Sequence, residues 1–517
     1  MAPASASTST LFDALPADFD LKPIVVRDHR TTLSGKQLRQ ACAQLAGKLL
    51  AAQAPRAALL ARNSPAWIIA DLACQLAAIS CLPLPGFFSL DQKTHALNDS
   101  GVELLMCDSD CDRDHPDFYR WLNTHFTRTD RDADLDIWQR STPQSRLALP
   151  EGTGKITYTS GSTGFPKGVC LSNDQLVIQA SALAQKTGLR HPKHLCLLPL
   201  SVLLENVAGV YTALVAEGEV LAPDQGLLGF SGSTTVNGKV LLNALNDYNP
   251  DSLIIIPQLL SLLISACQQG WKPPSNLEFI AVGGSRVSAG LIAKARDFKL
   301  PVYEGYGLSE CASVVSLNTP NADLPGSAGK PLNHLNVSVE KGEVIVSGNS
   351  FLGYIGDPSS WNKATVATGD RGHLDDNGFL HLDGRKKNLL INSFGRNISP
   401  EWLESELMSG ELISECIVFG DARPHLIALI LPGNRVDNMA VDQWLNTLNQ
   451  RLPDYARIHK WHRLKGSMAA TEGLFTSTGK PRREAIYRHF HDAIAQLYGA
   501  NGDSYSGTST TQEIVTQ

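Results

Sequence analysis

The sequence predicts an α/β protein: a large N-terminal domain of layered α/β subdomains with a small barrel-like β subregion, followed by a small C-terminal α+β domain. Three observations lead to this fold class. The 517 residues exceed what one hydrophobic core usually organises, so at least two domains are expected. The first third alternates helical and extended apolar patterns, which favours a largely parallel sheet. From about Asn336 the chain changes to short alternating segments between Gly and Asp turns.

The first elements follow from the spacing of apolar side chains. Residues 38–49 place Leu and Cys side chains on one helical face, and the run AALLA at 57–61 has the composition of a buried strand. Ser64 is suited to cap the next helix, because Pro65 follows at the first helical position. A second extended segment lies at 82–84.

The later elements are shorter and more varied. Segments 337–339 and 343–346 predict small antiparallel strands. After Gly384 the mixed pattern returns, with a helix expected over 400–407 and a strand over 416–419.

Composition narrows the class of protein. The chain has 45 Lys plus Arg against 51 Asp plus Glu, a net charge of -6, which argues against a nucleic-acid partner held by bulk basic charge. A hydrophobic content of 43% excludes disorder as the overall state. The polar segment 501–517, rich in Ser and Thr, is predicted to be a disordered tail.

The ten cysteines and the apolar segments indicate a cytoplasmic location. The cysteines are scattered without zinc-like spacing, which favours reduced thiols. The N-terminus MAPASASTST has no apolar region of the secretory kind. The most apolar run, 252–266, contains Pro257 and is too short for a bilayer, so no transmembrane segment is expected.

The most informative segment is ITYTSGSTGFPKGVCL at 156–171. A β-branched strand runs into a loop of glycines and hydroxyl residues and then a lysine. Glycines let backbone N–H groups close on a polyphosphate, hydroxyls add donors, and one lysine adds charge. The spacing differs from a Walker A loop, because Pro166 precedes the lysine and Gly168 follows it. The candidate phosphate-binding residues are Thr159, Ser160, Gly161, Ser162, Thr163, Gly164 and Lys167.

The run TSGSTGFPKGV at 159–169 resembles the AMP-binding signature of the adenylate-forming superfamily, which contains acyl-CoA synthetases, peptide-synthetase adenylation domains and firefly luciferase. Further motifs follow in the order of that family, and the resemblance extends from about Leu33 to Phe490. The chain is most similar to fatty acyl-CoA synthetases.

The motif YGLSE at 306–310 resembles the Y-G-x-T-E motif of the family, with serine in place of threonine. The resemblance implies that Tyr306 stacks on adenine, that the Ser309 hydroxyl lies near the α-phosphate and that Glu310 binds Mg²⁺, an ion that needs oxygen ligands. Thr159 is the second metal candidate. The remaining nucleotide-site candidates implied by the resemblance are Gly283, Gly284, Ser285, Glu304, Gly305, Gly307 and, for the ribose hydroxyls, Asp370 of the TGD motif and Arg385.

The segment GRKKN at 384–388 resembles the junction between the two domains of the family, with Lys387 at the hinge position. The resemblance divides the chain into a large adenylation domain, 1–384, and a small mobile domain, 385–500. It also implies that Gly395 lies in the loop lining the thiol tunnel. TSTGKPRR at 476–483 resembles the catalytic-lysine motif, which makes Lys480 the residue bridging the carboxylate and the α-phosphate.

The implied reaction is ATP-dependent activation of a carboxylic acid to acyl-AMP with release of pyrophosphate, followed by transfer to the thiol of CoA. Both steps place negative charge on phosphate oxygens, so positioning and electrostatic stabilisation should dominate catalysis. Segments 198–201 and 306–331 are most similar to medium- and long-chain fatty acid enzymes, which favours an apolar acid. The apolar residues 202–204 suit an acyl tunnel or ordinary helix packing equally well.

Two alternatives remain open at the level of the sequence. The enzyme could load an acyl or aryl acid onto the phosphopantetheine of an acyl carrier protein, or the chain could be a degenerate adenylate-binding protein. The second is disfavoured because Lys480, Glu310, Asp370 and Arg385 are all present.

Overall fold

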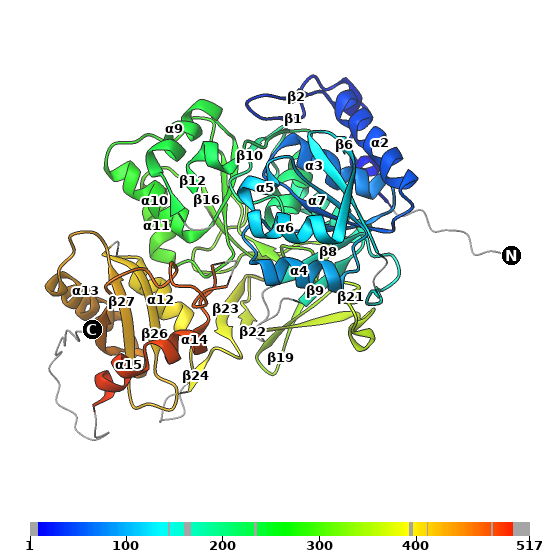
Figure 1. Ribbon diagram of the computed structural model, residues 1–517. Coiled ribbons are helices and arrows are strands. Elements are labelled where there is room, and N and C mark those ends of the chain that lie inside the picture. Colours follow the sequence, from blue (N-terminus) through cyan, green and yellow to red (C-terminus); the bar gives the residue numbers. More distant parts are fainter. Residues whose placement is uncertain are drawn as a thin grey trace.

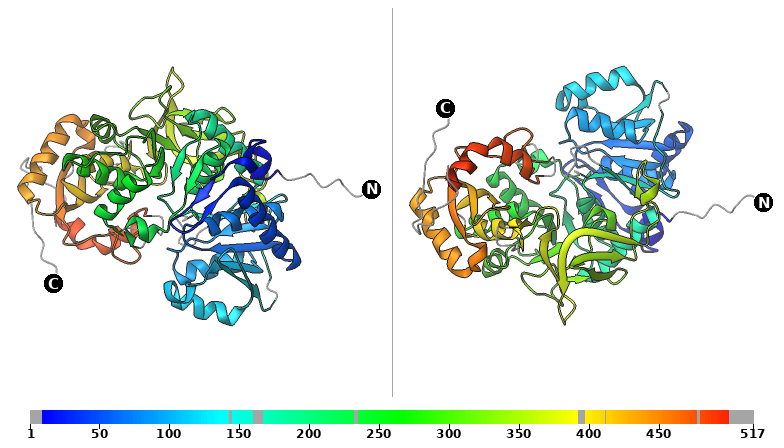
Figure 2. Two further views of the ribbon diagram at one scale, coloured as in Figure 1. Left: turned by 90° about the horizontal axis from the view of Figure 1, so that it is seen from above. Right: turned by 90° about the horizontal axis from the view of Figure 1, so that it is seen from below.

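The computed structural model describes residues 9–142, 145–159, 167–231, 235–391, 397–410, 412–476 and 479–499. Two large mixed sheets form the N-terminal part, and a separate α+β unit lies beside them at the C-terminal end of the chain (Figure 1). Both further views keep this unit, coloured orange to red, at the opposite end from the N-terminal segment (Figure 2).

The first large sheet has eight strands in the order β21-β9-β8-β4-β3-β5-β7-β6. Its central strands β8, β4, β3 and β5 are parallel, as the alternating helix and strand pattern predicted, and antiparallel strands complete both edges. The strands are β3 (Arg56–Leu60), β4 (Ser80–Pro83), β5 (Leu104–Asp108), β6 (Phe126–Asp132), β7 (Leu135–Arg140), β8 (Lys155–Thr159), β9 (Lys167–Leu171) and β21 (Gly353–Tyr354).

The second long helix of this region begins where the sequence predicted. The Ser64 hydroxyl accepts a hydrogen bond from the backbone N–H of Trp67, and Pro65 occupies the first helical position. The predicted helix over 38–49 is the middle of a longer one that buries its Leu and Cys face. The helices are α1 (Leu11–Ala14), α2 (Gly35–Ala51), α3 (Pro65–Leu76), α4 (Leu90–Asp99), α5 (Cys111–Asp114) and α6 (Pro116–His125).

The second large sheet has nine strands in the order β18-β17-β16-β15-β14-β10-β11-β1-β2. One face packs on helices α9, α10 and α11, which lie together in green in Figure 1. The strands are β1 (Val26–Arg27), β2 (Thr32–Leu33), β10 (Lys193–Leu195), β11 (Glu219–Leu221), β14 (Ser252–Ile255), β15 (Phe279–Val282), β16 (Val302–Tyr306), β17 (Ser316–Leu317) and β18 (Lys330–Pro331), and the helices are α9 (Gly238–Tyr248), α10 (Pro257–Gln268) and α11 (Ala289–Asp297).

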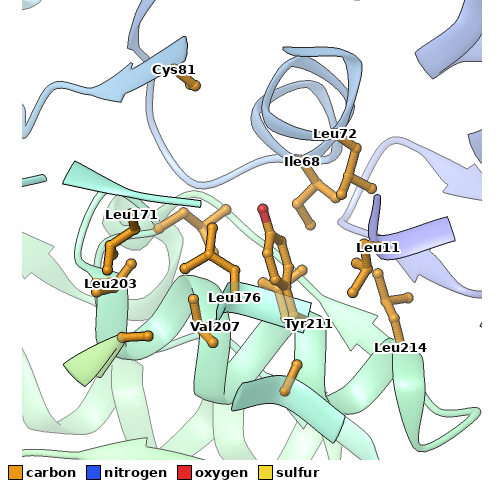
Figure 3. Close-up of a cluster of buried hydrophobic side chains, with 14 of the residues drawn as sticks. Leu11, Ile68, Leu72, Cys81, Leu171, Leu176, Leu203, Val207, Tyr211 and Leu214 are labelled. Atoms are coloured by element: carbon orange, nitrogen blue, oxygen red, sulfur yellow. The ribbon is translucent and has the colours of Figure 1, made fainter. Parts of the chain in front are cut away.

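The other face of the second sheet packs on helices that lie between the two sheets: α7 (Asn173–Thr187), the π-helix η2 (Leu204–Tyr211) and its continuation α8 (Thr212–Val215). Tyr211 points from η2 toward Ile68 and Leu72 of α3, and Leu176 of α7 lies nearby (Figure 3). This apolar contact joins the two sheets into one core. The π-helical form of η2 is also notable, because π-helical turns often occur at functional sites.

A smaller antiparallel sheet follows in the order β19-β20-β22-β23. Its first two strands confirm the predicted segments at 337–339 and 343–346. The predicted barrel-like subregion is corrected to an open sheet, because no pairing joins β19 to β23 among the described residues. The strands are β19 (Asn336–Glu340), β20 (Glu343–Ser347), β22 (Thr365–Leu374) and β23 (Leu380–Arg385), and a two-stranded ribbon elsewhere comprises β12 (Phe230–Ser231) and β13 (Thr235–Val236).

The C-terminal part has its own hydrophobic clusters, whose members all come from Leu390 onward. A three-stranded sheet in the order β26-β27-β28 carries helices whose apolar faces form these clusters, which fits a small α+β domain. The elements are β24 (Leu390–Ile391), β25 (Asn397–Ile398), α12 (Pro400–Met408), β26 (Ile413–Phe419), β27 (Leu426–Pro432), α13 (Asn438–Arg451), β28 (Ile458–Arg463), α14 (Arg483–His489) and α15 (His491–Tyr498).

All ten cysteines are buried and free of disulfides. Among the helices of the described ranges, none has the length and apolar character needed to cross a membrane. The run at 252–266 instead forms β14 and most of α10. The predicted tail at 501–517 lies outside the described residues.

Candidate active site

Three of the predicted nucleotide residues meet where β16 approaches the small antiparallel sheet. Asp370 and Arg385 are opposite one another on β22 and β23, and the Arg385 guanidinium donates to Asp370 Oδ1 at 2.9 Å. The Tyr306 hydroxyl, at the end of β16, donates to Asp370 Oδ2 at 2.6 Å. Burial and the adjacent carboxylate raise the pKa of Tyr306, so its hydroxyl stays a donor and fixes the position of the Asp370 side chain.

A second contact joins the phosphate loop to the YGLSE motif through Tyr354, which the sequence analysis missed. The Tyr354 hydroxyl donates to Glu310 Oε1 at 2.8 Å, and the Lys167 ammonium lies 5.4 Å from the centre of the Tyr354 ring. Lys167 is paired with Thr159 across β8 and β9. Tyr354 therefore holds Glu310 beside the two described ends of the phosphate loop. No motif marks this tyrosine, because its role depends on the pairing of β21 with β9.

The glycine-rich turn after β15 lies beside β16. Val282 and Glu304 are register partners, so Gly283 is level with Gly305 at the carboxyl ends of the two strands. Gly284 has a φ of 82°, a left-handed conformation that favours glycine. Burial raises the pKa of Glu304 to about 8, and one of its oxygens accepts from the backbone N–H of Val287 at 3.4 Å. The Glu304 carboxyl is therefore largely protonated at neutral pH.

Lys480 reaches the same region from the C-terminal part. The backbone N–H of Lys480 donates to the Thr476 hydroxyl at 2.9 Å, and Pro481 forms a bridge to Phe475, which shapes the turn. Its side chain is exposed to solvent and lines the same cavity as Arg385, Asp370 and Glu310. Desolvation in the cavity and the positive charge of Arg385 lower the pKa of Lys480, against the opposing effect of Asp370 and Glu310.

All these side chains line one cavity of about 2980 Å³ between the N-terminal and C-terminal parts. The cationic side chains of Lys167, Arg385 and Lys480 line it together with the carboxylates of Glu310 and Asp370, a combination that suits a polyphosphate and a divalent cation. The predicted residues on its wall are Thr159, Lys167, Gly283, Gly284, Ser285, Glu304, Gly305, Tyr306, Gly307, Ser309, Glu310, Asp370, Arg385, Lys387 and Lys480. The predicted residues Ser160, Gly161, Ser162, Thr163, Gly164 and Gly395 lie outside the described residues.

The same cavity extends between the two large sheets, where its walls are mainly apolar. Phe279 and Ala281 of β15 line it, together with Ala208 of η2 and Ala213 of α8, and the three alanines contribute only small side chains to the wall. The segment 202–204 also lines the cavity, while Leu203 packs in the core. The segment therefore contributes both to the cavity wall and to the core, and its role in an acyl tunnel stays a prediction. A buried polar cluster in this region, formed by His194, Glu205 and Ser252, was missed altogether.

Comparison with known proteins identifies the family. Residues 14–355 match the family described as AMP-binding enzyme, and residues 387–502 match the AMP-binding enzyme C-terminal domain. The chain therefore belongs to the AMP-binding enzyme family, and the resemblance to the adenylate-forming superfamily is confirmed.

Curated relatives define the enzyme class more closely. A 2-succinylbenzoate–CoA ligase from Bacillus velezensis is 26% identical over 75% of this chain and 79% of the relative. A feruloyl-CoA synthase from Amycolatopsis is 27% identical over 90% of this chain and 95% of the relative. A long-chain-fatty-acid–CoA ligase from Mycobacterium bovis is 26% identical over 68% of this chain and 71% of the relative. The predicted class, AMP-forming acid–thiol ligase, is confirmed.

Solved structures share the fold. An anthranilate CoA ligase in complex with anthranoyl-AMP superposes with a TM-score of 0.78 at 16% identity, covering 94% of this chain and 98% of the other. An o-succinylbenzoate coenzyme A synthetase from Bacillus subtilis in complex with ATP and magnesium ion gives 0.73 at 22% identity, covering 92% and 98%. The predicted fold class, with a large N-terminal and a small C-terminal domain, is confirmed.

Proposed function

We propose that this enzyme activates an apolar carboxylic acid with ATP, forming acyl-AMP and pyrophosphate, and then transfers the acyl group to the thiol of CoA. The observation that carries this proposal is the position of Lys480. It enters the cavity from the C-terminal part, where its charge interacts with those of Arg385, Asp370 and Glu310 from the N-terminal part and the segment joining the two. A cation beside a nucleotide site suits a step in which negative charge develops on the α-phosphate.

In the first half-reaction, a carboxylate oxygen attacks the α-phosphorus and pyrophosphate leaves. Tyr306 packs against the adenine, and Asp370 with Arg385 holds the ribose hydroxyls. Lys480 bridges the carboxylate and the α-phosphate, so it orients the nucleophile and neutralises charge. Thr159 and Lys167, with the loop residues 160–164, hold the remaining phosphates.

The donor set also suits a magnesium ion. Glu310 Oε1 accepts from Tyr354, which orients the carboxylate so that its second oxygen can meet a cation. Mg²⁺ prefers a few such oxygen ligands together with water and phosphate oxygens. Glu310 with Thr159 would hold the ion, which would neutralise phosphate charge when bound.

For the second half-reaction, the C-terminal domain would turn about Lys387, removing Lys480 and bringing the loop around Gly395 to the cavity. Lys387 is exposed beside β23 and β24, a position that can absorb a change of backbone angle. The domain boundaries 1–384 and 385–500 belong to this proposal, and the separate hydrophobic clusters from Leu390 onward support them.

The apolar extension of the cavity supports an apolar acid. The relatives act on acids that differ widely, from 2-succinylbenzoate to long-chain fatty acids, so their names fix only the class. Their acceptor is CoA, which favours CoA over a carrier-protein phosphopantetheine. The cytoplasmic location and the absence of nucleic-acid partners stay predictions.

The test is pyrophosphate release from ATP with a panel of straight-chain and aromatic acids, with CoA or a phosphopantetheinylated carrier protein as acceptor. We expect acid-dependent pyrophosphate release and consumption of CoA. Pyrophosphate release with transfer only to the carrier protein would support the carrier-loading alternative. A purified, folded enzyme that binds ATP and releases no pyrophosphate with any acid would refute the proposal.

A further inference from the structure

Three buried polar side chains, His194, Glu205 and Ser252, form a hydrogen-bonded triad in the apolar extension of the cavity. His194 on β10 and Ser252 on β14 are register partners, and His194 Nδ1 lies 3.0 Å from the Ser252 hydroxyl. His194 Nε2 lies 2.7 Å from Glu205 Oε1, on the π-helix. The other Glu205 oxygen accepts from the backbone N–H of Leu198 at 2.8 Å. His194 and Ser252 face the cavity, and Glu205 is fully buried behind them.

Gly209 of the π-helix leaves the space that this triad needs. A Cβ atom at Gly209 would lie 2.5 Å from Glu205 Oε1 and 2.6 Å from His194 Nε2, so only glycine lets the π-helix approach β10 so closely. Buried polar groups cost free energy unless they are paired, and here each polar atom of His194 and Glu205 has a partner. Ser252 is the member whose hydrogen-bonding capacity these contacts do not exhaust, because a hydroxyl offers one donor and two acceptor sites.

The protonation of His194 decides what Ser252 presents to the cavity. With a neutral ring, Nε2–H donates to Glu205, Nδ1 accepts from the Ser252 hydroxyl, and Ser252 presents lone pairs. With a charged ring, Nδ1–H donates to Ser252, whose O–H group is then free to donate into the cavity. A ligand hydroxyl can both donate and accept, so it fits either state. A ligand carboxylate only accepts, so it fits only the charged state, and burying its charge between the apolar walls of this part of the cavity costs free energy.

The distance between this triad and the nucleotide residues sets the length of the ligand. Ser252 is paired with Phe279 at the start of β15, and Gly283 lies four residues further along, just past the end of that strand. At about 3.3 Å per residue, the two levels are roughly 13 Å apart. The intervening wall carries Ile254 and Ala281, which offer no side-chain hydrogen bond.

We infer that Ser252, oriented by His194 and Glu205, binds a hydroxyl group at the end of the acid remote from its carboxylate. The substrate class is therefore an apolar acid with a distal hydroxyl group, in preference to the plain acid or the diacid. The inference rests on the proposed acid activation, because the carboxylate must lie at the level of Gly283 and Gly305. Ser252 is thus a specificity-determining residue, and His194 with Glu205 positions it.

The test compares straight-chain acids of increasing length, from octanoic to dodecanoic, with their ω-hydroxy analogues and the matching α,ω-diacids, by ATP-dependent pyrophosphate release. At the best length we expect the ω-hydroxy acid to exceed the plain acid about tenfold in kcat/KM, the effect of one buried hydrogen bond. Ser252→Ala should abolish this preference while turnover of the plain acid changes less than about threefold. The diacid should be the poorest of the three.

Thr187→Val is the matched control, because Thr187 lines the same cavity but its hydroxyl donates to the backbone carbonyl of Leu183 at 3.0 Å. It should leave the preference unchanged. A preference that survives Ser252→Ala, or a plain acid that is better than its ω-hydroxy analogue at every length, would overturn the inference while leaving acid activation intact. Absence of pyrophosphate with every acid would instead overturn the proposed function, and this inference with it.

Discussion

Substitution of Lys155 by methionine tests whether the strand that leads into the phosphate loop is held by a buried charge. The Lys155 ammonium lies 2.8 Å from Asp71 Oδ1 and 3.0 Å from Oδ2, and both side chains are 1% exposed. It also donates to Asn206 and, at 3.1 Å, to the Tyr211 hydroxyl. These contacts join β8 to α3 and η2, so one charged group connects the phosphate loop to the core between the sheets.

The expected cost follows from what remains around Asp71. Methionine keeps the length of the side chain but leaves the carboxylate without its cation, which for buried pairs costs about 3 to 5 kcal/mol. Tyr211 and Asn206 still donate to Asp71 Oδ2, at 2.6 and 3.0 Å, so we expect the lower end, about 3 kcal/mol. For a domain of the size of residues 1–384 this corresponds to a fall in the thermal midpoint of roughly 4 °C. Calorimetry of the N-terminal transition would measure it.

Lys36→Met is the matched control, because Lys36 is exposed on α2, and it should change stability by less than about 0.5 kcal/mol. Adding Asp71→Asn to Lys155→Met should restore part of the loss, since the uncompensated charge is gone. A Lys155→Met enzyme that melts within about 1 °C of the unaltered enzyme would refute the reasoning, and so would a double variant less stable than the single one.

Three further predictions concern the active site. Lys480→Ala should lower acid-dependent pyrophosphate release about 100- to 1000-fold, while thioester formation from prepared acyl-AMP stays within about threefold. Stopped-flow assays of the two half-reactions would measure both rates, and equal losses would contradict the proposed role of Lys480. The pKa of Lys480 is lowered, and the proposed bridging role requires its cationic form. Adenylate formation should therefore decline with rising pH before an ordinary lysine deprotonates. Lys480→Arg should remove that alkaline decline, and an unchanged pH profile would exclude Lys480 as its cause. In the folded protein Glu304 has a pKa of about 8, against an ordinary value of 4.5. Its contribution to the free energy of unfolding is therefore fully present below pH 4.5 and is lost as the pH rises toward 8. Urea unfolding should show that the free energy of unfolding falls by about 2 to 3 kcal/mol between pH 5 and 7, and the fall should be smaller in Glu304→Gln.

Much of the fold was predictable because its signals are local. The Ser64 cap with Pro65, the apolar face of α2 and the alternating strands at 337–339 and 343–346 depend on residues close in the chain. The barrel-like subregion was a wrong prediction because closure depends on whether the first and last strands pair, and strand patterns carry no information about that. The family was predictable for a different reason, since several motifs in a fixed order are specific together.

The sequence by itself determined the phosphate-binding composition at 156–171 and the identity of Tyr306, Glu310, Asp370, Arg385 and Lys480 as one set of candidates. Only the tertiary structure decided which side chains orient them. Tyr354 reaches Glu310 because β21 pairs with β9, and His194 meets Ser252 because β10 lies beside β14. Contacts of this kind join residues 44 and 58 positions apart, and a hydrogen bond formed between strands depends on their order and register, which no local pattern specifies.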